Sequence, residues 1–244
     1  MENQNKTTEQ LSIPSILFLH LFPGLVILLL SILFANPHWG FGLPVFLSLL
    51  LAISFGLIPV ELGILYYVAR KKGKKLRDIL GFTTQMPVGK TLLCALPCFV
   101  IAVIAFGLIK EPEHKLFADI FAWVPNWFRI NVSDIGSNSL LIIGTTVLLN
   151  FIFNGILGPL VEELYFRGYL LPRMARLGKW APLVNTVLFS VYHLFTPWEN
   201  ITRIIAITPM VYAVWYKRNI KIGIIVHCTL NTMSAVMLTV FLLS

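Results

Sequence analysis

The chain has 244 residues, of which 57% are hydrophobic and 12% charged, and its mean hydropathy is +0.81. This composition excludes a soluble domain with an ordinary polar surface, because such domains carry about 25% charged residues. The formal net charge of +8 does not indicate nucleic acid as a partner, since the Lys and Arg residues stand in short blocks between apolar runs.

Three long apolar runs occupy the first part of the chain, at Ile13–Phe34, Leu43–Ala69 and Val88–Ile109. Each is long enough to cross about 30 Å of hydrocarbon as a helix. The basic segment Arg70–Asp78 follows the second run and predicts a cytoplasmic loop, so the N-terminus is also expected in the cytoplasm. Aromatic residues within 110–138 predict an amphipathic stretch that lies on the outer surface of the membrane.

Polar residues interrupt the apolar runs of the second part. One long helix, tilted or broken near Pro159, is expected from Ser139 to Leu171, because proline removes a backbone donor. Shorter spans are expected at 180–195, 201–216 and 222–243. The predicted fold is therefore all-α, a polytopic transmembrane helical bundle of about seven to eight membrane helices. Residues 1–138 would supply the N-terminal helices and the interfacial segment, and residues 139–244 a catalytic core.

Ionisable and amide side chains gather within these late spans, where such groups usually face a cavity or a partner. They are Glu162, Glu163, Arg167, His193, His227 and Asn231. The i,i+4 spacing of Glu163 and Arg167 predicts an ion pair, while Glu162 points about 100° away and is expected to be free. His227 and Asn231 share the same spacing and are expected to face one cavity.

The three late spans place these groups at a similar depth, near the middle of the bilayer. A carboxylate there can take a proton from water, and a neutral imidazole can orient that water. An imidazole or an amide can also donate to a developing oxyanion. The pattern therefore predicts the parts of a hydrolase. Glu61, a lone carboxylate in the second run, is left outside this site, as a residue that either lines the same cavity or has a structural role.

Three short motifs, each in its own late span, resemble those of the CPBP family, which includes the type 2 CAAX prenyl proteases and the bacteriocin-processing or ABI proteins. They are Glu-Glu-x-x-x-Arg at Glu162, Glu163 and Arg167, Phe-x-x-x-His at Phe189 and His193, and His-x-x-x-Asn at His227 and Asn231. The resemblance covers roughly residues 139–243 and implies an intramembrane endopeptidase, a hydrolase. It implies that Glu162 and His193 activate water and that His227 and Asn231 form an oxyanion site. It also implies that Glu163, Arg167 and Phe189 support the site.

The resemblance leaves the role of a metal open. If a metal such as Zn²⁺ binds, its ligands are expected to be Glu162, His193 and His227, but the chain has no HExxH helix, and we expect no required cofactor. The expected partners are membrane lipids and a membrane-associated peptide or protein substrate. The small size favours a bacterial or archaeal member of the family in the cytoplasmic membrane. Two alternatives are a proteolytically silent immunity or scaffold protein of the same fold and, less favoured, a proton-coupled transporter.

Overall fold

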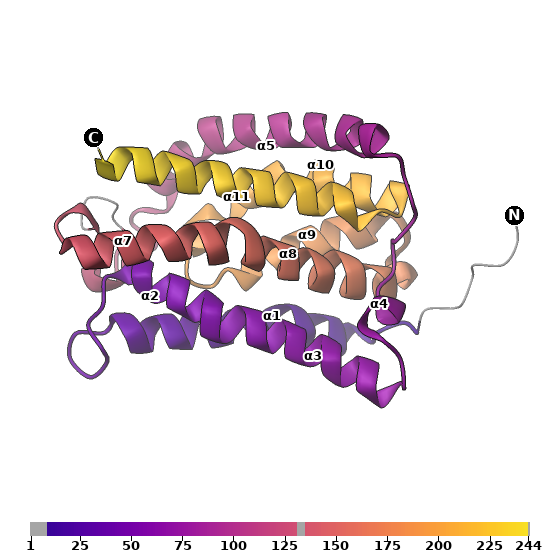
Figure 1. Ribbon diagram of the computed structural model, residues 1–244, viewed down its shortest axis with the longest axis horizontal. Coiled ribbons are helices and arrows are strands. Elements are labelled where there is room, and N and C mark those ends of the chain that lie inside the picture. The colour runs from indigo at the N-terminus through magenta and orange to yellow at the C-terminus, as the bar shows by residue number, and fades with distance from the viewer. Residues whose placement is uncertain (1–8, 131–134, 244) are drawn as a thin grey trace, which may run out of the picture.

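The structure is a computed structural model that describes residues 9–130 and 135–243, and helices form its regular structure (Figure 1). The α-helices are α1 (Ile13–Ala35), α2 (Val45–Ala52), α3 (Ile58–Lys71), α4 (Leu76–Ile79), α5 (Val88–Phe117), α7 (Leu140–Leu149), α8 (Gly158–Glu162), α9 (Ala181–Tyr192), α10 (Asn200–Lys217) and α11 (Ile220–Leu243). Three π-helical stretches continue some of them, at Ile53–Leu57, Asn150–Leu157 and Glu163–Leu170. Three 3₁₀ stretches lie at Asn126–Phe128, Leu171–Trp180 and Pro197–Glu199.

Within the described residues, five helical runs are long and apolar enough to cross a membrane. They are Ile13–Ala35, Val45–Lys71, Val88–Phe117, Leu140–Tyr192 and Ile220–Leu242. The all-α class is thus confirmed, whereas the expected seven to eight spans are not. The fourth run merges two of the expected spans, and α9, with 12 residues, reaches only about 18 Å, which is short of the hydrocarbon thickness. Helix α10 has 18 residues but is not among the five.

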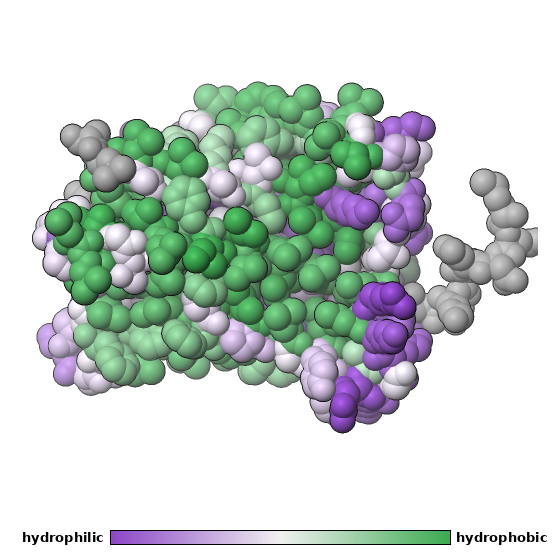
Figure 2. Space-filling view, in the orientation of Figure 1, coloured by the Kyte–Doolittle hydropathy of each residue, from purple (hydrophilic) through white to green (hydrophobic). Residues whose placement is uncertain are grey.

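The surface divides into an apolar middle and polar ends. In Figure 2 hydrophobic residues cover the central part of the molecule and hydrophilic residues gather at its ends. Large apolar side chains such as Leu29, Leu93 and Leu148 are more than half exposed. A soluble monomer does not present so large an apolar surface, so this chain is an integral membrane protein.

The helix expected to tilt or break near Gly155, Gly158 and Pro159 is continuous there but irregular, because its backbone is π-helical over Asn150–Leu157. Pro159 has no N–H to donate to the carbonyls four and five residues earlier, those of Gly155 and Asn154. Side chains of α11 donate to both instead. Thr232 Oγ1 lies 3.2 Å from the Gly155 oxygen, and Asn231 Nδ2 lies 3.0 Å from the Asn154 oxygen. The irregular backbone is therefore satisfied by a neighbouring helix, as it must be at membrane depth.

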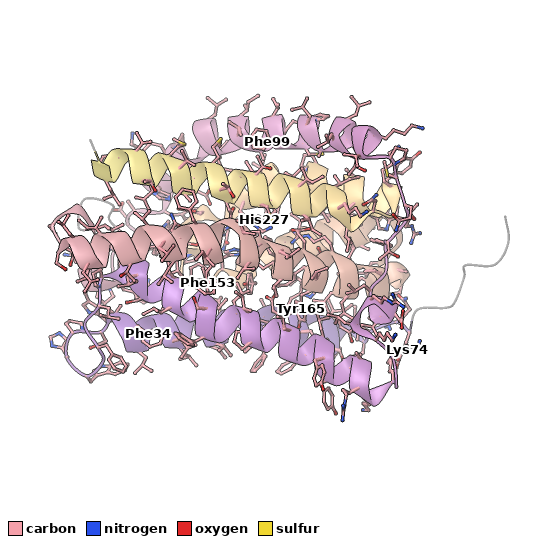
Figure 3. The ribbon with its side chains drawn as sticks, in the orientation of Figure 1. Phe34, Lys74, Phe99, Phe153, Tyr165 and His227 are labelled. Carbon is pink, nitrogen blue, oxygen red and sulfur yellow. The ribbon has the colours of Figure 1, made fainter. Side chains whose placement is uncertain are left out.

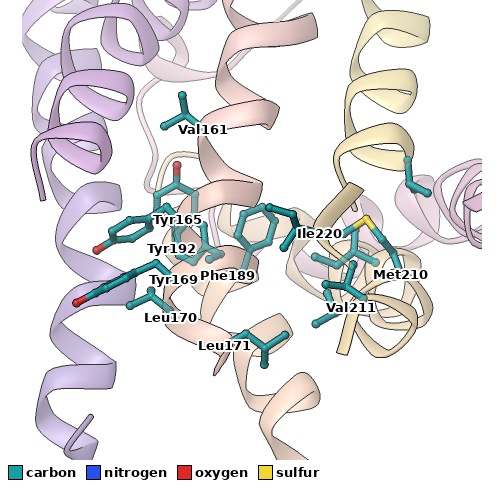
Figure 4. Packing of buried hydrophobic residues seen from close by; sticks show 14 of the residues in the cluster. Val161, Tyr165, Tyr169, Leu170, Leu171, Phe189, Tyr192, Met210, Val211 and Ile220 are labelled. Carbon is teal, nitrogen blue, oxygen red and sulfur yellow. The ribbon is translucent and has the colours of Figure 1, made fainter. Parts of the chain in front are cut away.

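The chain reverses after the third π-helical stretch and returns as α9. Gly178 has φ +53° and ψ −131°, a conformation that glycine adopts without strain. Phe189 of α9 then packs against Phe166, with ring centroids 4.9 Å apart. Figure 4 shows Phe189 and Tyr192 of α9 among the buried side chains of this region. Helix α1 crosses the end of α9 at Gly24, where a Cβ atom would collide with the carbonyl oxygen of Tyr192. The reversal and this close crossing place the end of α9 beside the helical segment that carries Glu162 and Glu163. This segment, α8 together with the π-helical stretch Glu163–Leu170, is called the Glu-Glu helix below.

Candidate active site

A buried ion pair lies at the centre of the site. Arg167 Nη1 and Glu163 Oε1 are 3.1 Å apart, and both side chains are fully buried. This is the pair that their i,i+4 spacing predicts. The Arg167 guanidinium also lies over the Phe189 ring, 4.0 Å from its centroid, a cation–π contact between the first and second motifs.

Glu162 is not free, and the prediction that it would be is wrong. Tyr192 Oη donates a hydrogen bond to Glu162 Oε1 at 2.9 Å, and Glu162 Oε2 lies 3.8 Å from His227 Nε2. The hydroxyl comes from another helix, so spacing along a single helix could not predict it. The rotation of 100° per residue also does not apply to the π-helical backbone that begins at Glu163.

His227 connects the two glutamates from α11 and is labelled near the middle of the bundle in Figure 3. Its Nδ1 lies 3.0 Å from Glu163 Oε1, and its side chain is 12% exposed. When Nδ1–H donates to Glu163, the lone pair of Nε2 faces the Glu162 carboxylate. The buried ion pair therefore sets the orientation of this imidazole.

His193 lies at the end of α9 and packs against the Phe189 ring. Its Nδ1 is 2.8 Å from the Phe189 carbonyl oxygen, which leaves Nε2 as the nitrogen available for chemistry. The Phe189 ring contacts both imidazoles, with centroid distances of 4.9 Å to His193 and 5.9 Å to His227. The structure thus gathers both histidines and both glutamates around one aromatic ring.

The turn that follows His193 is held by Arg203, a residue that sequence reasoning missed. The Thr196 N–H donates to the His193 carbonyl oxygen at 2.9 Å. Arg203, which is buried, donates to Thr196 Oγ1 at 3.0 Å, to Asn200 Oδ1 at 3.2 Å and to the Ser190 carbonyl oxygen at 3.4 Å. One guanidinium therefore ties the last turn of α9 to the first turn of α10.

Helix α5 anchors the start of α10 from outside. The two oxygens of Glu113 accept the N–H groups of Ile201 and Thr202, each at 2.7 Å. Glu199, just before α10, pairs with Lys110 of α5 at 3.0 Å. Glu113 thus replaces the intrahelical partners that the first N–H groups of α10 lack.

The charge environment of Glu199 is set by two opposing effects. Burial raises the pKa of its carboxyl, but the positive charges of Lys110 and Arg203 together outweigh burial and hold that pKa below the ordinary value. Glu199 therefore stays ionised in the folded protein at neutral pH, as a partner of both cations.

The surroundings of Asn231 and of Glu61 are contacts that the sequence did not indicate. The Asn231 amide donates to the Asn154 carbonyl oxygen, so its predicted place in an oxyanion site stays a prediction. Glu61, on α3, is fully buried, and neither of its oxygens has a hydrogen-bond partner among the described residues. Its only sequence signal was a carboxylate inside an apolar run.

The described residues also bear on the fit of a metal. Among residues 9–130 and 135–243, no three His, Cys, Asp or Glu side chains form a group that could hold a metal ion. The arrangement therefore does not make a metal-ligand set of Glu162, His193 and His227.

A cavity of about 290 Å³ lies away from this site. Its lining comes from the loop between α1 and α2 and from the segment after α5, and includes Pro37, Leu43, Trp127 and Arg129. None of the motif residues lines it. This cavity is therefore separate from the candidate site.

Fold and site together define an integral membrane protein with a cluster of glutamate, histidine and arginine side chains inside its helical bundle. Residues 144–233 match the family model described as Rce1-like, type II CAAX prenyl endopeptidase. The matched segment includes all seven motif residues and confirms the resemblance of this part of the chain to the CPBP proteins. No curated protein and no solved structure matches the chain significantly.

Proposed function

We propose that the protein is an intramembrane endopeptidase that hydrolyses a peptide bond of a membrane-associated peptide or protein. The observation that carries the proposal is the convergence of Glu162, His193 and His227 around Phe189, from three separate helical segments. Ionisable groups are costly in the bilayer interior, and their convergence in one place favours a functional site.

The proposed reaction begins with water beside Glu162. The carboxylate takes a proton from the water while the oxygen attacks the carbonyl carbon of the peptide, and His193 Nε2 orients that water. Asn231, if it is released from Asn154, donates to the oxyanion, and His227 also donates through Nε2–H when both of its ring nitrogens carry a proton. The C–N bond then breaks as Glu162 passes its proton to the leaving nitrogen, which restores the carboxylate.

The supporting residues fix the rotamers of these groups. The Tyr192 hydroxyl holds one oxygen of Glu162 and leaves the other toward His227. Glu163, paired with Arg167, fixes the His227 ring. Such preorganisation limits the rearrangement that the reaction requires.

A second candidate function is a proteolytically silent scaffold or immunity protein of the same fold. The observation in its favour is that Asn231 is already hydrogen-bonded within the bundle, to the Asn154 carbonyl oxygen. An active enzyme must open a path between helices to admit its substrate.

The deciding experiment measures cleavage of membrane-anchored peptides by the purified protein in liposomes, with products identified by mass spectrometry. Glu162→Gln and His193→Ala are each expected to abolish cleavage, while Thr146→Val, a buried isosteric change on α7, is expected to leave it unchanged. Cleavage that is undiminished in both site variants refutes the mechanism, and loss on chelation alone redirects it to a metal. A wild-type protein that cleaves none of the peptides supports the silent alternative.

A further inference from the structure

Glu61 is the buried acid that the site described so far does not use. It lies in the first turn of α3, its exposed fraction is 0%, and both of its carboxylate oxygens lack a hydrogen-bond partner among the described residues. The other buried glutamates have partners: Glu113 binds two backbone N–H groups, Glu162 binds Tyr192, and Glu163 binds Arg167 and His227.

A carboxylate in this position is destabilising unless something else solvates it. Burying a polar group without a hydrogen bond costs free energy, and burying an unpaired charge costs more. An apolar residue of similar size would avoid this cost. A buried polar atom without a partner often marks a bound water.

The surroundings of Glu61 are the candidate active site itself. Helix α3 packs against α8 and against the π-helical stretch Glu163–Leu170, and α8 lies between α3 and α11 in Figure 1. The charges of Glu162, Arg167 and Glu163 act on the Glu61 carboxyl. Helix α3, which carries Glu61, and α11, which carries His227, therefore both pack against the Glu-Glu helix.

Donors that could complement Glu61 are present in the same region. Arg167 forms its ion pair with Glu163 Oε1, yet Arg167 Nε and Nη2 and Glu163 Oε2 have no hydrogen-bond partner among the described residues. A buried water needs two to four polar partners. Unpaired acceptors and donors in one region of the bundle meet that requirement.

We propose that Glu61 and Arg167 bind internal water behind the Glu-Glu helix, and that Glu61 is a positioning residue for the hydrolytic site. The water completes the hydrogen bonds of Arg167 and so fixes the Glu163–His227 arm that faces Glu162. The bound water also stays next to the hydrolytic site. This role rests on the proposed peptidase function, but the binding of water does not.

The first test is a high-resolution experimental structure of the wild-type protein. Ordered water within hydrogen-bond distance of Glu61 and of Arg167 is expected, and a dry site overturns the proposal. This result does not depend on activity. If the protein cleaves no peptide, the proposed function fails, but the experimental density map still shows whether water is bound at Glu61 and Arg167.

The second test is kinetic and compares Glu61→Leu with Glu61→Gln. The control is Thr146→Val, which removes a different buried polar group that also lacks a hydrogen-bond partner among the described residues. Glu61→Leu is expected to lower kcat about tenfold or more, with KM nearly unchanged and no fall in the thermal midpoint. Glu61→Gln, which keeps polar atoms for the water, is expected to lose less. Wild-type kcat in Glu61→Leu overturns the positioning role, as does a parallel fall of kcat and thermal midpoint in Glu61→Gln. If the Leu variant does not fold, the Gln variant alone decides. A lower kcat with an unchanged thermal midpoint then supports the positioning role, and a wild-type kcat overturns it.

Discussion

The contact between Glu113 and the start of α10 allows a quantitative prediction. In Glu113→Ala the N–H groups of Ile201 and Thr202 lose both of their 2.7 Å acceptors, in a place where Glu113 is 3% exposed. A hydrogen bond to a charged group contributes about 1.5–3 kcal/mol, and water can re-enter part of the gap, so we expect the free energy of unfolding to fall by about 3 kcal/mol. Glu113→Gln keeps one acceptor and is expected to lose about half as much.

The assay is equilibrium unfolding in detergent micelles, with Glu111→Ala as the matched control. Glu111 lies two residues earlier on α5, is 70% exposed and pairs with Lys115 at 3.4 Å. An exposed i,i+4 pair contributes about 0.3–0.5 kcal/mol, so the control should be nearly neutral. Because α10 also carries Arg203, which holds the turn after His193, peptide cleavage should fall with Glu113→Ala. Equal effects of the Glu111 and Glu113 variants would refute the reasoning.

Three further predictions concern other contacts. Gly223→Ala should lower both the thermal midpoint and cleavage, because a Cβ atom there would collide with the Glu163 carboxylate. Thr232→Val should lower the free energy of unfolding by about 1–2 kcal/mol, since the Gly155 carbonyl oxygen loses its donor at membrane depth. Neighbouring cations hold the pKa of Glu199 below 4.5, the value expected in the unfolded chain. The stability that Glu199 contributes is therefore present in full above pH 4.5 and is lost as the pH falls through the folded-state pKa. Acid unfolding of Glu199→Gln should show a shallower pH dependence in that window.

Controls for these variants lie on the same or similar helices. Gly89→Ala, where a Cβ atom meets nothing within 4 Å, should be neutral. Thr239→Val removes a hydroxyl that bonds only to the Ala235 carbonyl oxygen of its own helix, and should cost less than Thr232→Val. A Gly89 variant as damaging as the Gly223 variant would contradict the collision argument.

The parts of the fold that depend on local sequence could be predicted. Apolar run length gave the first three spans and the last, and i,i+4 spacing gave the Glu163–Arg167 pair. The position of Pro159 located the backbone irregularity, because the missing donor acts within one or two turns of its own helix.

The contacts that depend on the packing of distant segments could not be predicted. The Tyr192 hydroxyl reaches Glu162 across 30 residues of sequence, and Glu113 reaches α10 across 88. Helix α9 ends at Tyr192, where the turn held by Arg203 begins, and hydropathy alone does not indicate this end because Leu194 and Phe195 continue the apolar run. No pattern along one helix contains the position of a neighbouring helix.

The hydrogen bonds around Pro159 also explain the spacing of the last motif. His227 meets Glu163, and Asn231, four residues later on α11, meets the Asn154 carbonyl oxygen that Pro159 leaves without a donor. Two contacts at a fixed spacing define the register of α11 against the Glu-Glu helix. A single-residue insertion between His227 and Asn231 would rotate one of them by about 100° and break one contact whichever way the helix settled. The motif therefore constrains the assembly of the bundle, in addition to any role its side chains have in chemistry.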